Sequence, residues 1–281
     1  MIDRSKPRRV TRRRFLKTAL AVVAGSAGYA HFIEPRLVQF ERVSVAVPSL
    51  PANLEGYTIG VLADLHAGEL TSPAFIAGVC NRLLALKPDL VVVAGDMTAA
   101  SRPPEAHRLV DESLAPVRGA YGVLGNYDIF HMRQPPMGVK VQSTVRLLVN
   151  QGVLVAPGLW LGGLDEGIFG EPDVGKALAG APKDAVRILL AHEPDLADLV
   201  RPEHRVSLMI SGHTHGGQVR LPILGAVALP PLGRKYVAGL NRAPACQVYT
   251  SRGVGVTGLP FRFLCPPEVT LLTLRRAKAG N

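Results

Sequence analysis

The stretch that decides the fold is YTIGVLADLH at residues 57–66, followed after one helical segment by LVVVAGD at residues 90–96. Each stretch ends a short apolar run with an acid, Asp64 in the first and Asp96 in the second. Between them, Ser72-Pro73 is typical of a helix cap and first helical residue, and apolar side chains then recur at helical spacing. This pattern predicts a β-α-β unit with both acids at strand ends, where open α/β sheets bind ligands.

Three later motifs also place polar side chains at the ends of apolar runs. They are Gly-Asn-Tyr-Asp at residues 125–128, His192 after residues 186–191, and Gly-His-Thr-His-Gly-Gly at residues 212–217. Each motif alone is common, but five such pieces in this order are typical of a two-metal hydrolase site. Two divalent ions roughly 3.5–4 Å apart clamp both oxygens of a phosphoryl transfer and supply a hydroxide at neutral pH.

The residue types suit such a pair of ions. Asp96 is the expected bridge, because a carboxylate at a strand end can offer one oxygen to each ion. Asp64 and His66 lie two residues apart, so an extended strand turns both to one face. His213 and His215 share this spacing, beside glycines that allow tight bends. Imidazole mixed with carboxylate favours manganese, iron or zinc over calcium.

Other roles are open for these residues. Asp64 and Asp96 could be hydrogen-bonded structural acids, although an unpaired carboxylate near the interior is costly. His192 would also suit a satisfied core position, and Asn126 would also suit a turn beside Gly125. The remaining histidines have no partner at ligand spacing and are expected at the surface: His31, His107 and His204.

From about residue 57 to residue 274, the pattern resembles the calcineurin-like metallophosphoesterases. The resemblance implies an α/β fold, a four-layer α/β/β/α sandwich of two packed mixed sheets flanked by helices. It also implies two divalent metal ions and hydrolysis of a phosphodiester or pyrophosphate by a metal-bridging hydroxide. The first metal would be held by Asp64, His66, Asp96 and His215, and the second by Asp96, Asn126, His192 and His213.

Three further stretches resemble a membrane-associated branch of that family. They are GGQVRLP at residues 216–222, GRKY at residues 233–236 and PE at residues 267–268. This branch includes phosphodiesterase-type enzymes and the UDP-2,3-diacylglucosamine pyrophosphatases. The resemblance therefore implies a substrate such as a phospholipid or a nucleotide-linked glycolipid.

Tyr127 departs from the family pattern, which has a histidine at this position. In the family, that histidine pairs with an acid such as Asp128, steadies the transition-state charge and helps the leaving group. A tyrosine, with an ordinary pKa of about 10, carries no positive charge, and a positioned general acid is worth roughly 100- to 10,000-fold in rate. His131, four residues on, is either a replacement or an ordinary loop residue. The alternative to an enzyme is a catalytically impaired metal-binding interaction module.

The sequence offers three candidate substrate contacts, His131, Arg252 and Arg262. Arg252 and Arg262 follow predicted strand and loop positions where guanidinium groups would match phosphate oxygens, although surface arginines are equally common. The apolar residues 221–232 either face acyl chains or the membrane surface, or form a core hairpin.

Short strands toward the C-terminal end indicate that two sheets pack face to face. Further strands are predicted at residues 121–124, 153–155, 159–161, 186–191, 206–210, 247–250 and 269–274.

The N-terminal residues 1–30 resemble a twin-arginine export signal. Thr-Arg-Arg-Arg-Phe-Leu-Lys at residues 11–17 precedes an Ala-rich apolar stretch. Eight Lys or Arg and one Asp within residues 1–17 supply +7 of the net charge of +10. The basic charge therefore indicates targeting, and no nucleic-acid partner is expected. A cytoplasmic membrane tether is the alternative.

The expected organisation follows from these segments. Residues 1–30 are the signal or an N-terminal membrane anchor, residues 31–55 a linker and first strand, residues 56–276 the metallophosphoesterase domain, and residues 277–281 a tail. Export would place a monomer in the periplasm or on the outer face of the cytoplasmic membrane, where an uncleaved N-terminus would anchor it. The expected partners are the export machinery, the membrane surface and a phosphorylated small-molecule or lipid substrate. Cys246 and Cys265 are either paired or free.

Overall fold

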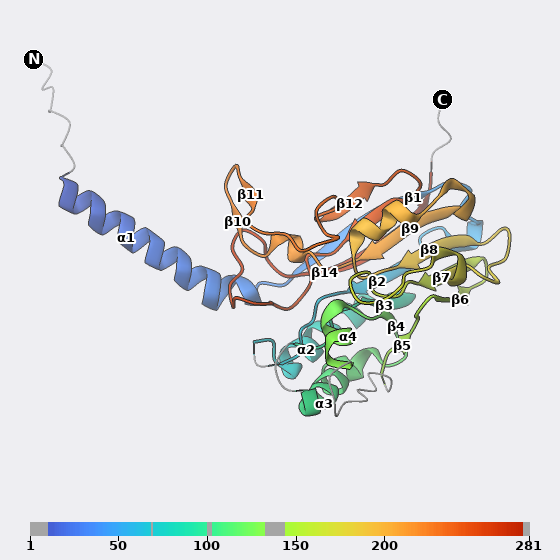
Figure 1. Cartoon of the computed structure of the whole chain (residues 1–281), viewed down its shortest axis with the longest axis horizontal. Coiled ribbons are helices and arrows are strands. Elements are labelled where there is room, and N and C mark those ends of the chain that lie inside the picture. The colour runs from blue at the N-terminus through green and yellow to red at the C-terminus, as the bar shows by residue number, and fades with distance from the viewer. Residues whose placement is uncertain (1–10, 69, 100–102, 133–143, 278–281) are drawn as a thin grey trace, which may run out of the picture.

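Two six-stranded mixed sheets packed face to face make up the domain (Figure 1). The computed structural model describes residues 11–68, 70–99, 103–132 and 144–277. The predicted mixed α/β architecture of two packed sheets is confirmed. Its central strands coincide with the predicted apolar runs, and most of their residues are buried, as expected where a sheet is covered on both faces.

The first sheet contains the β-α-β unit predicted from residues 57–96. Its spatial order is β1 (Gln39–Val47), β14 (Glu268–Arg276), β2 (Thr58–Leu62), β3 (Leu90–Ala94), β4 (Tyr121–Val123) and β5 (Arg146–Leu147). β14 is antiparallel to β2, whereas the other neighbouring strands are parallel. β1 pairs with β14 along nine residues, so the strand expected within residues 31–55 forms an edge of this sheet.

The second sheet also has six strands. Its order is β12 (Gly239–Arg242), β13 (Gln247–Thr250), β9 (Val206–Ser211), β8 (Val186–Leu190), β7 (Leu159–Gly163) and β6 (Gln151–Ala156). The four inner strands are parallel, and an antiparallel strand closes each edge. The carboxyl ends of the parallel strands of both sheets are therefore available to build one site.

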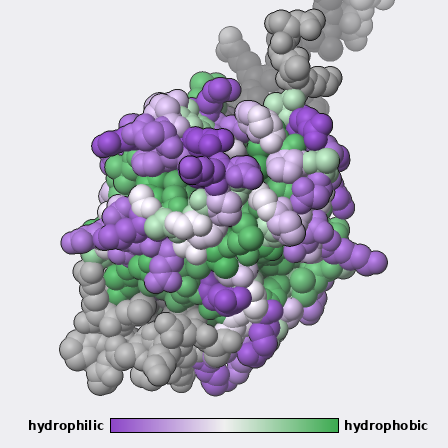
Figure 2. Space-filling model, turned by 90° about the vertical axis from the view of Figure 1, so that its right-hand side faces the viewer, coloured by the Kyte–Doolittle hydropathy of each residue, from purple (hydrophilic) through white to green (hydrophobic). Residues whose placement is uncertain are grey.

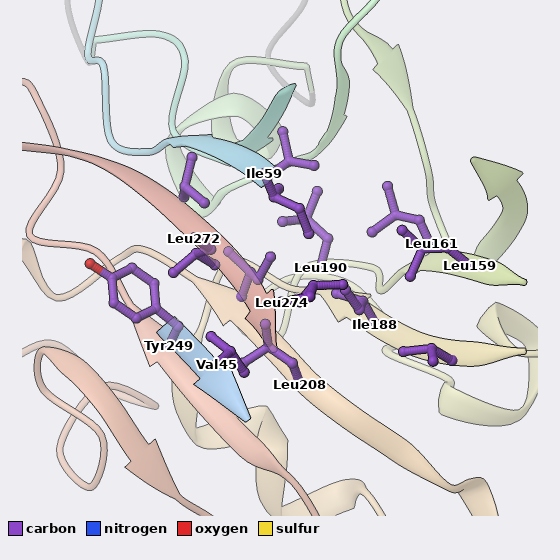
Figure 3. Packing of buried hydrophobic residues seen from close by; sticks show 14 of the residues in the cluster. Val45, Ile59, Leu159, Leu161, Ile188, Leu190, Leu208, Tyr249, Leu272 and Leu274 are labelled. Carbon is purple, nitrogen blue, oxygen red and sulfur yellow. The ribbon is translucent and has the colours of Figure 1, made fainter. Parts of the chain in front are cut away.

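The largest core lies between the sheets (Figure 3). Ile59 and Leu272 from the first sheet meet Leu190 and Leu208 from the second, and all four side chains are fully buried. Burial of such a side chain stabilises the fold by about 1.5–3 kcal/mol. This apolar contact holds the two sheets in the relative position that the polar strand ends require.

Helices cover the outer face of the first sheet more fully than that of the second. The first carries α2 (Pro73–Leu84), α3 (Pro103–Leu114), η4 (Ala115–Val117) and α4 (Asn126–Met132), and the second carries α5 (Val174–Ala177), η5 (Pro194–Leu199) and η6 (Pro202–His204). Ser72 caps α2 as predicted, since its hydroxyl accepts a hydrogen bond from Phe75 N. The fourth layer thus consists of short helical turns rather than long helices.

The N-terminal segment is one long helix that projects away from the domain (Figure 1). α1 (Arg12–Gly28) continues without a break through η1 (Tyr29–Ile33) and η2 (Glu34–Arg36). By length and composition, this helix from Arg12 to Arg36 is long and apolar enough to cross a membrane. The turns that follow α1 therefore lengthen the apolar helix.

Two expectations about single residues change with the structure. Cys246 and Cys265 are both buried and free, so they do not form a disulfide. His31, expected at the surface, is half-buried, and its Nδ1 lies 2.9 Å from the carbonyl oxygen of Pro260. Ala30 is also buried. The end of the N-terminal helix is therefore seated on the domain.

Candidate metal centre

Seven predicted metal ligands converge where strand ends from the two sheets meet. Asp64 and His66 follow β2, Asp96 follows β3, Asn126 follows β4, His192 follows β8, and His213 and His215 follow β9. Five of the seven have positive backbone φ angles between 44° and 71°, which residues other than glycine rarely adopt. These five are Asp64, His66, Asp96, His213 and His215. Such strain costs about 1–3 kcal/mol per residue and is typical of functional sites.

The first ligand cluster consists of Asp64, His66 and His215, and all three side chains are buried. The Nε2 atoms of His66 and His215 lie 3.0 Å apart, and Nε2 of His215 lies 3.7 Å from Oδ1 of Asp64. His213 N donates to both carboxylate oxygens of Asp64, at 2.8 and 3.0 Å. This contact ties the end of β2 in one sheet to the end of β9 in the other.

The second cluster consists of Asp96, His192 and His213, which are likewise buried. Nε2 of His192 lies 3.1 Å from Nδ1 of His213 and 3.3 Å from Oδ2 of Asp96. The same Oδ2 lies 3.6 Å from Nε2 of His66 in the first cluster. Asp96 therefore stands between the clusters, as a bridging ligand must.

The two carboxylate oxygens of Asp96 have different surroundings. Oδ1 of Asp96 accepts a hydrogen bond from Tyr127 N at 2.9 Å, so that oxygen is already engaged by the backbone. Oδ2 alone faces the histidines of both clusters. The local fold after β4 thus selects which oxygen is presented.

Asn126 supplies an independent sign that a ligand is required. Its Oδ1 atom is buried and has no hydrogen-bond partner among the described residues. A buried amide oxygen without a partner costs about 1–3 kcal/mol, and a divalent ion would satisfy it. The donor set of imidazole, carboxylate and amide oxygen fits manganese, iron or zinc.

Backbone carbonyls select the nitrogen that two histidines present. Nδ1 of His192 lies 2.8 Å from the carbonyl oxygen of Ala94, which leaves Nε2 directed at the cluster. His213 has the opposite arrangement, because its Nε2 lies 2.8 Å from the carbonyl oxygen of Pro231 and its Nδ1 faces His192. A ring nitrogen held in this way orients the other nitrogen for a metal.

The residues that precede Asp96, Asn126 and His213 are glycines because other parts of the site lie too close to them for a Cβ atom. A Cβ on Gly125 would lie 2.2 Å from Oδ1 of Asp96, and one on Gly95 would lie 2.4 Å from Nδ1 of His192. A Cβ on Gly212 would lie 2.6 Å from Oδ2 of Asp64. These glycines therefore let the strand ends pack side by side, and only Gly95 of the three also has a positive φ.

The electrostatics of the metal-free site favour the metal-binding protonation state for Asp96 and His213. Burial raises the pKa of Asp64 to about 7, and, against the effect of burial, the charge of Asp96 raises the pKa of His192 well above its ordinary value. Burial opposes the charge on Asp96, but the charge and hydrogen bond of His192, with the charges of His66 and His213, lower the pKa of Asp96 to about 2. Burial and the charge of His192 lower the pKa of His213 to about 4. At neutral pH, Asp96 is thus ionised and His213 neutral, the forms in which each binds a metal.

Tyr127 lies beside the first cluster. Its ring meets the His66 ring edge-on, with 5.0 Å between the ring centroids. The Thr257 hydroxyl donates to the phenol oxygen at 2.9 Å, so the phenol proton is free to be donated elsewhere. The position of the missing family histidine is therefore occupied by a hydrogen-bond donor.

Asp128 does not pair with Tyr127, in contrast to the expectation of an acid that supports the position-127 side chain. It is fully buried, and its carboxylate accepts from the backbone N atoms of Met97, Thr98 and Gly125 at 3.0–3.3 Å. The hydroxyl of Thr98 also donates to it at 3.0 Å. Asp128 thus positions the loops that carry Asp96 and Asn126.

Both candidate arginines have their guanidinium groups engaged by partners within the fold. Arg252 forms ion pairs with Glu41 and Glu268 at 2.9 and 3.0 Å. Arg262 is fully buried and donates to backbone carbonyls, including Gly255 O at 2.7 Å, and its Nη2 lies 3.4 Å from Nδ1 of His215. Both residues therefore support the loop behind the site. His131 lies in the last turn of α4, and its side chain falls outside the described residues.

Sequence reasoning missed two residues of this neighbourhood. Thr257 contacts the Tyr127 phenol, and a Cβ on Gly253 would lie 2.6 Å from Cβ of Asp64. Gly253 also has a φ of 69°. The run Arg-Gly-Val-Gly at residues 252–255, directly after a predicted strand, was the available signal.

Comparison with known proteins identifies the family. The sequence model for calcineurin-like phosphoesterases matches residues 57–217, which carry all seven candidate ligands. The chain belongs to the calcineurin-like phosphoesterase family. It is a metallophosphoesterase, with two candidate clusters for divalent metals.

Relatives of this phosphoesterase extend the similarity over nearly its whole length. The uncharacterized metallophosphoesterase YkuE of Bacillus subtilis (strain 168) is 30% identical over 95% of this chain and 99% of its own. The phosphodiesterase YaeI of Escherichia coli (strain K12) is 32% identical over 94% and 99%, respectively. A transmembrane protein with a metallophosphoesterase domain from Danio rerio is 30% identical over 92% of this chain and 61% of its own.

Proposed function

We propose that this phosphoesterase hydrolyses a phosphodiester or pyrophosphate bond with two divalent metal ions. The observation that carries the proposal is the pair of buried ligand clusters joined by Oδ2 of Asp96. The similarity to a relative named as a phosphodiesterase supports a diester substrate. A phospholipid or a nucleotide-linked glycolipid would suit an enzyme that carries an apolar N-terminal helix.

The residues divide between two ions. Asp64, His66, Asp96 and His215 would hold the first ion, and Asp96, Asn126, His192 and His213 the second. When bound, the ions supply Lewis acidity and a hydroxide at neutral pH. The chain itself contributes in two ways. Backbone carbonyls orient the rings of His192 and His213. The Tyr127 phenol, which accepts from Thr257, keeps its own proton available for donation. Manganese, iron and zinc all fit this donor set.

We further propose that the enzyme is exported by the twin-arginine route and stays anchored by its N-terminal helix. The triple arginine at residues 12–14 before an apolar stretch supports the route. The carbonyl oxygen of Ala30 accepts from Arg262 N at 2.9 Å, and the Glu34 carboxylate accepts from Leu264 N at 3.0 Å. Cleavage near Ala30 would remove contacts that hold this segment on the domain. These contacts therefore support an N-terminal helix that stays uncleaved.

A second candidate is a metal-binding interaction module with little or no turnover. Tyr127 in place of the family histidine favours it, because a neutral phenol cannot stabilise developing negative charge as an imidazolium does. It predicts bound metal without hydrolysis.

The deciding experiment uses the full chain in detergent, supplied with manganese, and a chromogenic phosphodiester beside its monoester. We expect turnover of the diester, and Asp96→Ala should abolish both turnover and the binding of two ions measured by metal analysis. Full metal binding and activity in Asp96→Ala would refute the two-metal assignment. Two bound ions in the unaltered chain without hydrolysis would establish the interaction module instead.

A further inference from the structure

The hairpin that follows the last metal ligands exposes apolar side chains. β10 (Arg220–Leu221) and β11 (Gly225–Ala226) follow η7 (His215–Gly217) directly. Around the hairpin tip, Ile223 is fully exposed, Leu224 is 79% exposed, and Val227 is 62% exposed. The apolar residues 221–232 are thus not a core hairpin at their tip. Side chains this apolar, gathered on one projection, are typical of an interaction surface.

A neighbouring loop extends this surface. Leu259 and Leu264 are 65% and 51% exposed. The loop is bonded to the base of the hairpin, because Arg220 N donates to Phe263 O at 2.8 Å and Phe263 N donates to Gln218 O at 3.0 Å. We call the exposed residues of the two segments the apolar rim: Leu221, Ile223, Leu224, Val227, Leu259 and Leu264.

The same loop holds the end of the N-terminal helix. Arg262 N donates to Ala30 O, and the Glu34 carboxylate accepts from the backbone N atoms of Leu264 and Cys265. Beside these contacts, Phe32 is 63% exposed. The apolar rim is therefore continuous with the helix from Arg12 to Arg36, which has the length and composition to cross a membrane.

The hairpin and the helix project from the same end of the domain (Figure 1). A bilayer crossed by that helix would reach the rim without any change in the fold. Figure 2 shows the opposite end, where hydrophilic residues are spread among the hydrophobic ones. Arg36 closes the helix at this junction and is exposed, a position where a cation reaches lipid headgroups.

We propose that the apolar rim inserts into the bilayer crossed by the N-terminal helix, as a second membrane attachment. The occupant is lipid, because the rim is continuous with an apolar helix of membrane-crossing length. Side chains of this kind enter the boundary between headgroups and acyl chains by about 5–10 Å. Since the hairpin follows His215 after a few residues, this attachment holds the metal centre beside the headgroups.

The test measures depth in the membrane and does not depend on catalysis. The full chain carrying Ile223→Cys is labelled with an environment-sensitive fluorophore and reconstituted in phosphatidylcholine and phosphatidylglycerol vesicles. Leu154→Cys is the matched control, because Leu154 is 48% exposed on β6, at the far end of the domain (Figure 1). The three native cysteines are buried, and labelling of the unaltered chain gives the background.

We expect lipids with a quencher near the headgroup to quench the label at position 223 at least twofold more than at position 154. Equal quenching at both positions would overturn the proposal. Shielding of position 223 from both lipid quenchers and aqueous iodide would also overturn it, and would indicate a contact between copies of the chain.

A second readout concerns the substrate and rests on the proposed function. Ile223→Asp combined with Leu224→Asp should lower hydrolysis of a phosphodiester lipid in vesicles by tenfold or more. Hydrolysis of the soluble chromogenic diester should stay within twofold, and Leu154→Asp should change neither. Equal activity of the double variant on both substrates would contradict a role for the rim in catalysis at membranes. If the unaltered chain does not hydrolyse the soluble diester, the proposed function is contradicted. The quenching experiment would still decide whether the apolar rim enters the membrane.

Discussion

Tyr127 is the residue at which this site departs from its family. The phenol lies edge-on to His66 and accepts a hydrogen bond from Thr257, while its backbone N atom donates to Asp96. The backbone of residue 127 can thus hold the carboxylate of Asp96 whichever side chain the residue carries. The side chain can be exchanged without removing the Asp96 contact, so its chemical contribution can be measured separately.

Tyr127→His should raise the turnover number for a chromogenic phosphodiester by up to roughly 100-fold, the lower end of what a positioned general acid contributes. An imidazolium would add the positive charge that a phenol lacks. Steady-state kinetics of Tyr127→His and Tyr127→Phe, each at saturating manganese, would measure the effect. A fall in turnover with histidine and with phenylalanine would show that the tyrosine has its own catalytic role.

At the scale of elements, the connections after β3 and β4 are joined by one buried carboxylate. Asp128 lies in the first turn of α4 and accepts from backbone N atoms in the loop after β3 and just before α4. This holds the Asp96 loop and the Asn126 turn at a set distance. The helix start therefore acts as a brace between two metal-binding loops.

Asp128→Ala should lower the free energy of unfolding of the metal-free protein by about 3 kcal/mol, since each buried N–H left without an acceptor costs about 1–3 kcal/mol. It should also weaken binding of the second ion, because Asn126 loses its support. Denaturant unfolding and equilibrium dialysis with manganese would check both effects. Asp173→Ala is the control, because Asp173 caps only α5 and its loss should cost about 1 kcal/mol. Unchanged affinity in Asp128→Ala would rule out the bracing role.

For the whole molecule, the metal centre is a junction between two sheets. Three strands of the first sheet and two of the second supply the ligands, and His213 N bonds to Asp64 across the junction. Without ions, the site keeps buried carboxylates beside crowded imidazoles, and burial raises the pKa of Asp64 to about 7 against the opposing charge of His192. We therefore expect metal binding to stabilise the packing of the sheets as well as the site.

Removal of metal with a chelator should lower the melting temperature by about 5–10 °C. Saturation at 100 times the dissociation constant contributes about 2.7 kcal/mol, and each kcal/mol moves a domain of this size by about 2–4 °C. Calorimetry before chelation, after chelation and after return of manganese would show the change and its reversal. Asp96→Ala should not respond to the chelator. A melting temperature that chelation leaves unchanged would contradict a metal-supported junction.

Much of the first sheet and of the ligand set could be predicted from single stretches of sequence. The apolar runs before Asp64, Asp96 and His192 form β2, β3 and β8 almost as predicted, because a strand buried on both faces needs an unbroken apolar run. The short strands of the hairpin, β10 and β11, carry no such signal, so the sequence alone does not separate a core hairpin from a membrane-facing segment. A two-residue strand depends on its tertiary neighbours and not on its own pattern.

By itself, the sequence determined the α/β class, the family and the residues that come together at the strand ends, because apolar periodicity and ligand chemistry are local properties. Tertiary structure alone decided which atoms meet. Arg262 is turned inward behind His215, Oδ2 of Asp96 is the oxygen that faces both clusters, and the N-terminal helix is seated on residues 260–265. These are contacts between segments up to about 230 positions apart, and only the packing of two sheets brings such segments within hydrogen-bond distance.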